Sequence, residues 1–236
     1  MSECLRLVIH GASGRMGRAL TRLVGDFPAL ELVGAVSGRA APGIAGVPGF
    51  RATQLDRLPD FDIGIDFSLP EALDPFLAIC VGRGAALVSG TTGLSPEQHG
   101  RLEAAATRIP VCWAATFSLG VAVLSDLVER AARVLPDWQR DIVESLHIHK
   151  QDAPSGTALA LGRAVMQGGG PEPHYASLRA GDIVGEHLMQ FTGPGERIEL
   201  VHRASNRDIF ARGALQCAAQ LPGRGAGHHR VLDLLG

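Results

Sequence analysis

A glycine-rich turn near the N-terminus constrains the fold more than any other feature of the chain. The apolar run Leu5–His10 (LRLVIH) is typical of a buried strand, and the turn Gly11–Gly17 (GASGRMG) follows it directly. Apolar residues then recur at helical spacing over 15–24, and a second apolar run covers 30–36. The order strand, helix, strand predicts a parallel sheet with a right-handed crossover.

The same alternation continues for about a hundred residues. Residues 37–51 are rich in glycine, alanine and proline and predict a loop. Three further strands are expected at 62–67, 85–89 and 111–115, with helices over 70–83 and 96–106 between them. The first part of the chain therefore predicts an α/β fold with a doubly wound parallel sheet.

The pattern changes in the second half. It predicts helices over 121–134 and 157–166, a strand over 141–149, and a hairpin of 186–192 with 196–203, joined by Gly193-Pro194-Gly195. A last helix is expected over 207–220. We therefore expect a smaller α+β domain over 118–206, and a first domain made of 1–117 and 207–236.

Charge and composition limit the class of partner. With 22 basic and 24 acidic residues the net charge is −2, so nothing favours nucleic acid or a membrane surface as partner. No run of about 20 apolar residues is present, and the N-terminus does not have the pattern of a signal peptide. The four cysteines are far apart, which favours reduced thiols and a cytoplasmic location.

The glycine-rich turn is also the first candidate binding site. Glycines allow the backbone to approach a pyrophosphate, and a helix N-terminus offers N–H donors to an anion. The candidate cofactor-binding residues are Gly11, Ala12, Ser13, Gly14, Arg15 and Met16. Their spacing is GxxGxxG rather than the stricter GxGxxG, so a plain tight turn is the alternative.

The end of the second strand bears on the choice of cofactor. An acidic residue there usually binds the adenosine ribose, but this chain has Ser37-Gly38-Arg39. A hydroxyl and a guanidinium match a 2′-phosphate, which favours NADPH over NADH. The alternative is that Arg39 is only a solvated loop residue.

Two more strand ends carry candidate cofactor contacts, because ligands of such sheets bind at the carboxyl ends of the strands. Gly90, Thr91 and Thr92 follow the fourth strand, and Ala114, Ala115, Thr116 and Phe117 follow the fifth. The alternative for the first segment is a turn with a helix cap.

The densest polar segment, His147–Thr157 (HIHKQDAPSGT), is the candidate substrate site. Lys150 suits a carboxylate, and Ser155, Gly156 and Thr157 lie where a helix begins, which makes an anion site. The alternative is that Ser155 only caps the helix. His147 and His149 have metal-ligand spacing, but no further ligand is nearby, so we expect no metal.

Taken together, these motifs resemble the dihydrodipicolinate reductase family along nearly the whole chain. The segments GASGRMG, DFSLPEA, GTTGL, AATFSLGV, HKQDAPSGTA, RAGDIVGEH and HRASNRDIFARGAL occur in the family's order, and KxDAPSGTA is very specific. The resemblance implies a Rossmann-type domain joined to a substrate domain that forms a homotetramer. It implies transfer of hydride from NADPH or NADH to a cyclic imine dicarboxylate, 4-hydroxy-tetrahydrodipicolinate, giving tetrahydrodipicolinate on the diaminopimelate route to lysine.

By motif match, the resemblance places His147, Lys150, Ser155, Gly156 and Thr157 on the substrate. One departure concerns the chemistry: where the family has its proposed general-acid histidine, this chain has Leu146, which cannot donate a proton. We expect Lys150 and His147 to be the catalytic residues. A paralogue that reduces another cyclic imine, or a non-catalytic NAD(P)-binding protein, are the alternatives. Thr116 stands where the family usually has asparagine.

Overall fold

The computed structural model describes residues 4–38 and 46–235. The chain divides into two compact units, one made of Met1–Phe117 with Phe210–Gly236, the other of Ser118–Ile209. No helix within the described ranges is long and apolar enough to cross a membrane. The thiols of all four cysteines are free.

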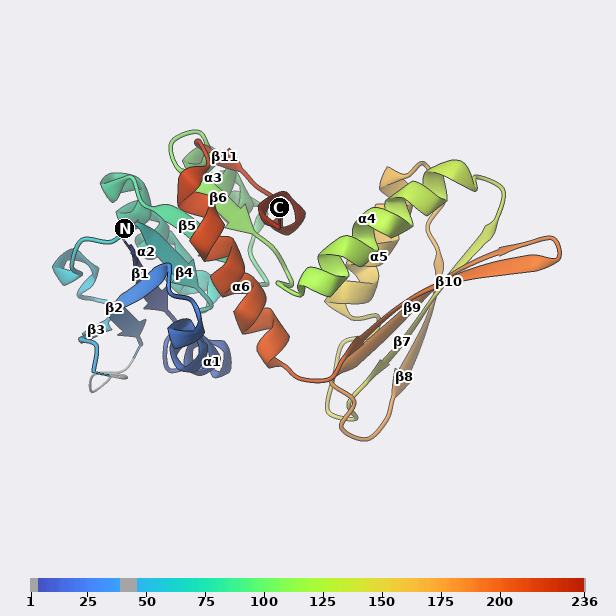
Figure 1. The fold of residues 1–236 in the computed structure, drawn as a ribbon, viewed down its shortest axis with the longest axis horizontal. Helices are drawn as coiled ribbons and strands as arrows, with labels where there is room; N and C mark the ends of the chain where they lie inside the picture. Colours follow the sequence, from blue (N-terminus) through green and yellow to red (C-terminus); the bar gives the residue numbers. More distant parts are fainter. Residues whose placement is uncertain (1–3, 39–45, 236) are drawn as a thin grey trace. The chain divides into compact units, whose positions relative to one another are not determined.

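The first unit contains a seven-stranded sheet in the order β11-β6-β5-β4-β1-β2-β3, drawn in Figure 1. Every neighbouring pair is parallel. The order reverses beside β1, so the glycine turn after β1 lies where ligands bind in such sheets. The strands are β1 (Leu5–His10), β2 (Leu30–Ser37), β3 (Gly49–Arg51), β4 (Ile63–Asp66), β5 (Ala86–Ser89), β6 (Pro110–Trp113) and β11 (Gly227–His228).

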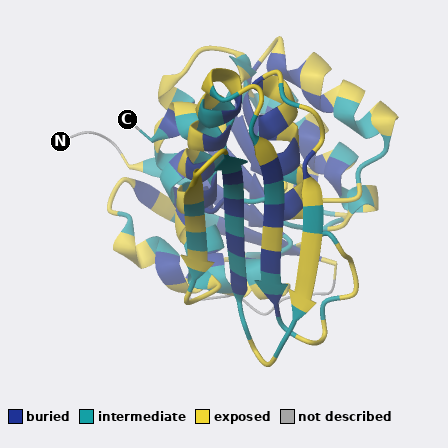
Figure 2. Cartoon of the chain, turned by 90° about the vertical axis from the view of Figure 1, so that its right-hand side faces the viewer, coloured by how far each residue is buried: buried dark blue, intermediate teal, exposed yellow. Residues whose placement is uncertain are grey.

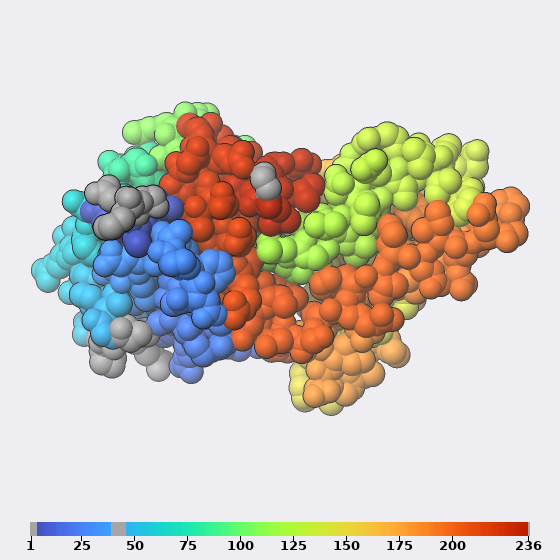
Figure 3. Space-filling model, viewed as in Figure 1, coloured from blue at the N-terminus to red at the C-terminus, as the bar shows by residue number. Residues whose placement is uncertain are grey.

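Helices cover both faces of this sheet. Val8, Leu87 and Val111 pack with residues of α2 (Pro70–Arg83) and α3 (Pro96–Ala106). The residues at the alternate positions of these strands face the other side of the sheet. There the thiol of Cys112 contacts that of Cys217 on α6 (Asp208–Gln220). Helix α1 (Arg15–Leu23) follows the glycine turn, and the ion pair of Arg212 with Asp26 joins α6 to the turn after α1. Figure 3 shows these two segments side by side.

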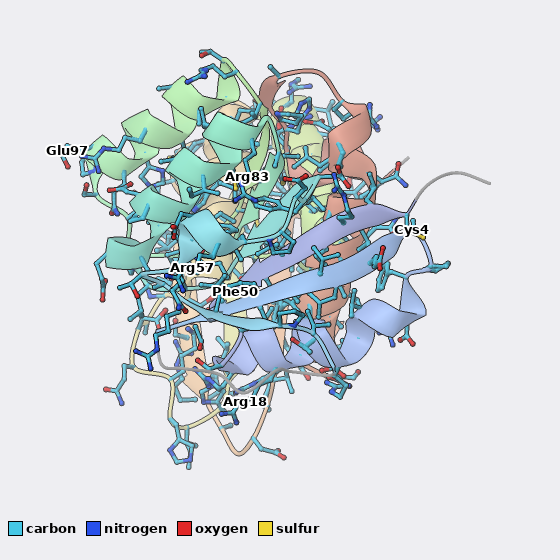
Figure 4. All side chains as sticks on the ribbon, turned by 90° about the vertical axis from the view of Figure 1, so that its left-hand side faces the viewer. Cys4, Arg18, Phe50, Arg57, Arg83 and Glu97 are labelled. Atoms are coloured by element: carbon cyan, nitrogen blue, oxygen red, sulfur yellow. The ribbon has the colours of Figure 1, made fainter. Side chains whose placement is uncertain are left out.

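Sequence signals explain the helix boundaries of this unit. Proline stands at the first turn of both α2 and α3, where a missing N–H costs nothing. Ser95 and Gln98 form a capping box at α3, and Gly84 ends α2 in a left-handed conformation. Figure 4 looks onto this side of the unit, with Glu97 in the first turn of α3.

The second unit is a four-stranded sheet with two helices on one face. The strand order is β10-β9-β7-β8, in which β7 and β8 are parallel and the other pairs antiparallel. Ile142, Met189 and Phe191 pack against α4 (Leu119–Val134) and α5 (Gly156–Gln167). The strands are β7 (Gln139–Leu146), β8 (His174–Arg179), β9 (Gly185–Gly193) and β10 (Glu196–Ala204).

The other face of this sheet carries no helix of its own unit. Val143, Leu178 and Val201 are on that face, and each is at least one-third exposed. Figure 2 shows the four strands together, with the exposed residues most numerous on the outer strands β8 and β10.

Three local expectations were wrong. Residues 49–51 form the edge strand β3 rather than loop, because pairing with β2 gives their backbone partners. Strand β8 was missed, since its residues are mostly polar and exposed at the edge. Strand β7 ends at Leu146, so His147 and His149 lie in the following turn and do not share a strand face.

Candidate active site

The glycine turn is so tight that two of its positions admit only glycine. Gly11 has a φ of +83°, and a Cβ there would lie 2.4 Å from the carbonyl oxygen of Phe67. A Cβ on Gly17 would lie 2.3 Å from the carbonyl oxygen of Gly11. The turn therefore brings the start of α1 against the ends of β1 and β4.

The N-terminus of α1 is open to an anion. Its N-cap residue is Gly14, which has no side chain to bond the N–H groups of the first turn, and the first turn holds no acidic residue. Ser13, Gly14 and Arg15 are exposed. Unbonded N–H groups and the helix dipole at an exposed turn fit a pyrophosphate, so these residues fit a dinucleotide.

A buried carboxylate links the loops around this turn. Asp66, the last residue of β4, is fully buried and accepts hydrogen bonds from His10 Nδ1 (2.9 Å), Ser68 Oγ (2.6 Å), Ser89 Oγ (3.0 Å) and Thr91 Oγ1 (2.6 Å). Burial acts to raise the pKa of Asp66, but the hydrogen bonds, led by that of His10, outweigh it and hold the pKa below its usual range. One ionised group thus fixes the ends of β1, β4 and β5.

The predicted contacts after β5 divide between support and surface. The Thr91 hydroxyl is used by Asp66, and the Thr91 carbonyl accepts from Trp113 Nε1 at 2.9 Å. A Cβ on Gly90 would lie 2.1 Å from the Phe67 ring, so any larger residue there would have to displace that ring. Thr92 is exposed. Thr91 therefore supports the loop, whereas Thr92 offers its side chain to solvent or a ligand.

The segment after β6 shows a similar division. Phe117 is buried and lies edge-on to Phe67, with 5.7 Å between the ring centroids. Ala115 is exposed, and Ala114 and Thr116 are half-buried. Arg39, expected at the 2′-phosphate, lies outside the described residues.

The candidate substrate residues of the second unit lie on the loop between β7 and α5. Lys150 Nζ is 2.8 Å from Asp152 Oδ1, and the Lys150 side chain is one-quarter exposed. Ser155 caps α5: its Oγ accepts from the N–H of Ala158 at 3.2 Å. Gly156 is exposed and Thr157 half-buried at the start of the helix. The helix start and one cation thus lie on a single loop.

Ser155 is held by two residues that the sequence analysis missed. Its N–H donates to both carboxylate oxygens of Glu144 at 3.1 Å, and its Oγ lies 3.2 Å from Nε2 of His187. Glu144 also accepts from Ser177 Oγ and from Arg179 Nη2, both at 2.8 Å. Burial acts to raise the pKa of Glu144, but the bonds from Ser155, Arg179 and Ser177 outweigh it and lower the pKa.

His187 is neutral in this setting. Burial lowers its pKa to about 4, because desolvation outweighs the attraction of Glu144, whose Oε2 is 3.7 Å from Nε2. At neutral pH the contact between His187 and Glu144 is therefore not an ion pair.

One sequence signal could have indicated Glu144 and Asp66, the two buried carboxylates that the sequence analysis missed. Glu144 alternates with Ile142 and Leu146, and Asp66 follows Ile63 and Ile65 in a strand that is buried on both faces. A carboxylate at a buried strand position must be paired, so each marks a polar network. Leu146 itself is 7% exposed and lies on the same sheet face as Glu144.

These features define a class of protein. A parallel sheet with an open helix N-terminus at its reversal point, followed by a separate α+β unit with a cationic loop, is the arrangement of a two-domain nucleotide-binding oxidoreductase.

Comparison with known proteins places the chain within that class. The family model described as the N-terminus of dihydrodipicolinate reductase matches residues 5–117, and that of the C-terminus matches residues 120–235. The chain belongs to the dihydrodipicolinate reductase family.

Similar proteins agree over the full length. The chain is 67% identical to the 4-hydroxy-tetrahydrodipicolinate reductase of Stenotrophomonas maltophilia strain K279a, over 98% of both chains. It is 59% identical to the one of Xanthomonas axonopodis pv. citri, over 99% of both. Its fold matches a dipicolinate-bound dihydrodipicolinate reductase from Paenisporosarcina sp. TG-14, with a TM-score of 0.84 at 21% identity over 99% of this chain and 100% of that one. The predicted family, fold class and reductase activity are confirmed.

Proposed function

We propose that the chain uses NADPH to reduce the cyclic imine dicarboxylate 4-hydroxy-tetrahydrodipicolinate to tetrahydrodipicolinate, the reaction named for its relatives. The observation that carries the cofactor half is the uncapped N-terminus of α1 behind the glycine turn. A nicotinamide cofactor supplies a hydride when it is bound. In this assignment the first unit is the dinucleotide-binding domain and the second binds the substrate.

The preference for NADPH rests on the end of β2. The strand ends at Ser37, and neither of the next two residues is acidic. A carboxylate there would bind a free ribose 2′-hydroxyl and repel a 2′-phosphate. Its absence, together with a guanidinium at Arg39, supports NADPH, with NADH as the weaker cofactor.

The roles in the second unit follow from charge and position. Lys150 binds one substrate carboxylate and keeps its contact with Asp152, because its ammonium group has three N–H donors. The exposed start of α5 at Gly156 and Thr157 binds the other, while Ser155 holds that helix start in place. His147, in the turn after β7, completes the set.

The proton that completes the reduction comes from Lys150 in this proposal. Leu146 has no proton to give, and His147 is the next candidate. An ammonium that already neutralises a substrate carboxylate is close to the reacting ring, so one residue both binds and donates.

The proposed oligomeric state and location of the protein follow from two further observations. The uncovered sheet face with Val143, Leu178 and Val201 fits an interface between copies of the chain, in keeping with a homotetramer. The free thiols of the four cysteines fit a cytoplasmic location.

Absorbance of the reduced nicotinamide tests the function. The imine is formed in place from pyruvate and aspartate semialdehyde by the preceding synthase, and the protein receives NADPH or NADH. Oxidation of NADPH that depends on the synthase is the expected result. Cofactor binding without oxidation would refute the proposed reaction, and faster oxidation of NADH would refute the preference.

A further inference from the structure

Glu144 is a buried carboxylate whose hydrogen bonds converge on one loop. Its side chain is 1% exposed and lies at the centre of the small sheet, on β7. A buried charge is costly unless several donors surround it, and here Ser155, Ser177 and Arg179 supply them. The pairing of β7 with β8 and β9 brings these donors together, since Glu144 is opposite Ser177 on one side and His187 on the other.

The bonds from Ser155 and Arg179 fix different parts of the loop between β7 and α5. The bidentate contact holds the N–H of Ser155 at the start of α5. Arg179 bridges Glu144 to the carbonyl oxygen of Asp152, with 2.6 Å from its Nη2 to that oxygen. Asp152 in turn contacts Lys150. The carboxylate therefore determines the spacing between the cation and the helix start.

His187 fixes the same loop from the opposite side. It is 5% exposed, and its Nε2 contacts the Ser155 hydroxyl that caps α5. Since the imidazole is neutral, it can hold this hydroxyl without also forming an ion pair with a substrate carboxylate.

We propose that Glu144 and His187 are positioning residues for the substrate, which set the distance between Lys150 and the N-terminus of α5 to match the two carboxylates of the ring. The inference rests on the proposed function, because it assumes that a dicarboxylate spans these two groups. Neither residue touches the reacting atoms.

The bonds of Glu144 distinguish this role from a purely structural one. Two of its three donors act on the loop between β7 and α5: Ser155 lies on that loop, and Arg179 bonds the carbonyl oxygen of Asp152 in it. The third donor, Ser177, comes from β8, and no donor comes from α4 or from the interior of α5. Apolar residues in place of the whole network would stabilise the fold about equally well, since a buried ion pair contributes little net stability. The network is therefore explained by what it positions.

Glu144→Gln is the first test, because the amide keeps the shape but presents an N–H₂ group to one of the present donors. We expect the KM for the imine to rise about ten-fold, the value that one lost charged hydrogen bond gives. The KM for NADPH should stay within about two-fold, since Glu144 and the glycine turn belong to different units. Glu129→Gln, a partly exposed carboxylate of α4 paired with Arg133, is the control and should change neither constant.

A second pair of variants examines His187. His187→Gln retains an amide near the position of Nε2 and should keep most of the affinity for the imine, whereas His187→Ala should lose it about ten-fold. Rescue by the glutamine variant is the result expected of positioning. Equal affinities for the imine in the two variants would overturn the role of His187.

Binding of dipicolinate, measured by calorimetry at saturating NADPH, separates this inference from the proposed reaction. If the native protein does not reduce the imine but Glu144→Gln weakens dipicolinate about ten-fold, the reaction is wrong and the positioning role stands. If the native protein is active and Glu144→Gln binds dipicolinate as tightly as it does, the positioning role is overturned. A variant that loses NADPH and dipicolinate in equal measure would also overturn it, because that pattern marks a general loss of folding.

Discussion

Nδ1 of His10 lies 2.9 Å from Oδ1 of Asp66, and both side chains are buried at the ends of adjacent parallel strands. The next residue after His10 is Gly11, so this pair lies directly behind the glycine turn that is proposed to bind the cofactor. Ser68 and Thr91 bond the same carboxylate and join two further loops to it. The geometry of the proposed cofactor site therefore depends on one carboxylate.

Asp66→Asn should destabilise the protein and weaken the binding of NADPH. The amide leaves His10 and at least one hydroxyl without a charged acceptor, so we expect a loss of about 3 kcal/mol in the free energy of unfolding. Urea denaturation measures this loss, and the KM for NADPH should rise in parallel. Asp26→Asn removes only the exposed pair with Arg212 and should cost less than about 1 kcal/mol. Equal losses in the two variants would contradict the role given to Asp66.

Gly11→Ala should disrupt the nucleotide turn. A positive φ costs an alanine about 1–2 kcal/mol, and its Cβ would collide with the carbonyl of Phe67. We expect lower stability and a several-fold higher KM for NADPH, with the affinity for dipicolinate retained. Gly25→Ala is the matched control, because nothing lies within 4 Å of its added Cβ. A Gly11→Ala protein with native NADPH affinity would show that the turn does not bind the cofactor.

Leu146→Ala separates packing from chemistry at the position of the family's proposed acid. The side chain is buried, so its truncation should cost about 2–3 kcal/mol of stability. Because leucine donates no proton, kcat at a temperature where the variant is folded should stay within about ten-fold of the native value. Thermal unfolding and steady-state reduction measure the two effects. A loss of kcat of a hundred-fold or more, in a folded variant, would show that Leu146 shapes the reaction itself.

Lys150→Ala should lower turnover far more than His149→Ala. Lys150 is the cation of the loop between β7 and α5 and is the proposed proton donor, whereas His149 is exposed in the turn. Loss of a general acid costs about 10²–10⁴-fold, and steady-state reduction of the imine measures it. Small and equal effects in the two variants would refute the assignment of Lys150.

The alternation of strands and helices was predictable because buried parallel strands are short apolar runs with glycine or proline at their ends, as in Leu5–His10. Strand β8 was not, since it is an exposed edge strand whose residues are mostly polar. The end of β7 was also missed, because the alternation in DIVESLHIH continues past the last ladder pair at Leu146.

The candidate site could be predicted where its residues are neighbours in the sequence. Gly11–Met16 and Lys150–Thr157 are contiguous segments, so each could be recognised as a motif from the sequence alone. The partners of Glu144 are separated from it by 11 to 43 residues and meet only through strand pairing, so no local pattern predicts them. For the same reason the sequence analysis did not predict that the hydroxyls of Thr91 and Ser155 bond the buried side chains of Asp66 and His187.

The pH dependence of stability should show the buried neutral state of His187. Its pKa is about 4 in the folded protein, against 6.5 in the unfolded chain. Between these values the unfolded chain binds a proton that the folded one does not, so stability is complete above pH 6.5 and falls as the pH is lowered. The expected loss between pH 7 and pH 5 is about 2 kcal/mol from this group.

His187→Gln isolates that effect, because burial also lowers the pKa of His202, which remains in both proteins. Glu144, whose pKa is lowered, contributes stability that is lost only below about pH 4.5, outside this window. Urea denaturation of the two proteins at pH 7, 6 and 5 therefore gives a difference that shrinks toward acid pH, since only the native protein loses this contribution. A difference that stays constant from pH 7 to 5 would mean that His187 takes up its proton equally in the folded and the unfolded state, so that its pKa is not lowered and Ser155 is held by an imidazolium at pH 5.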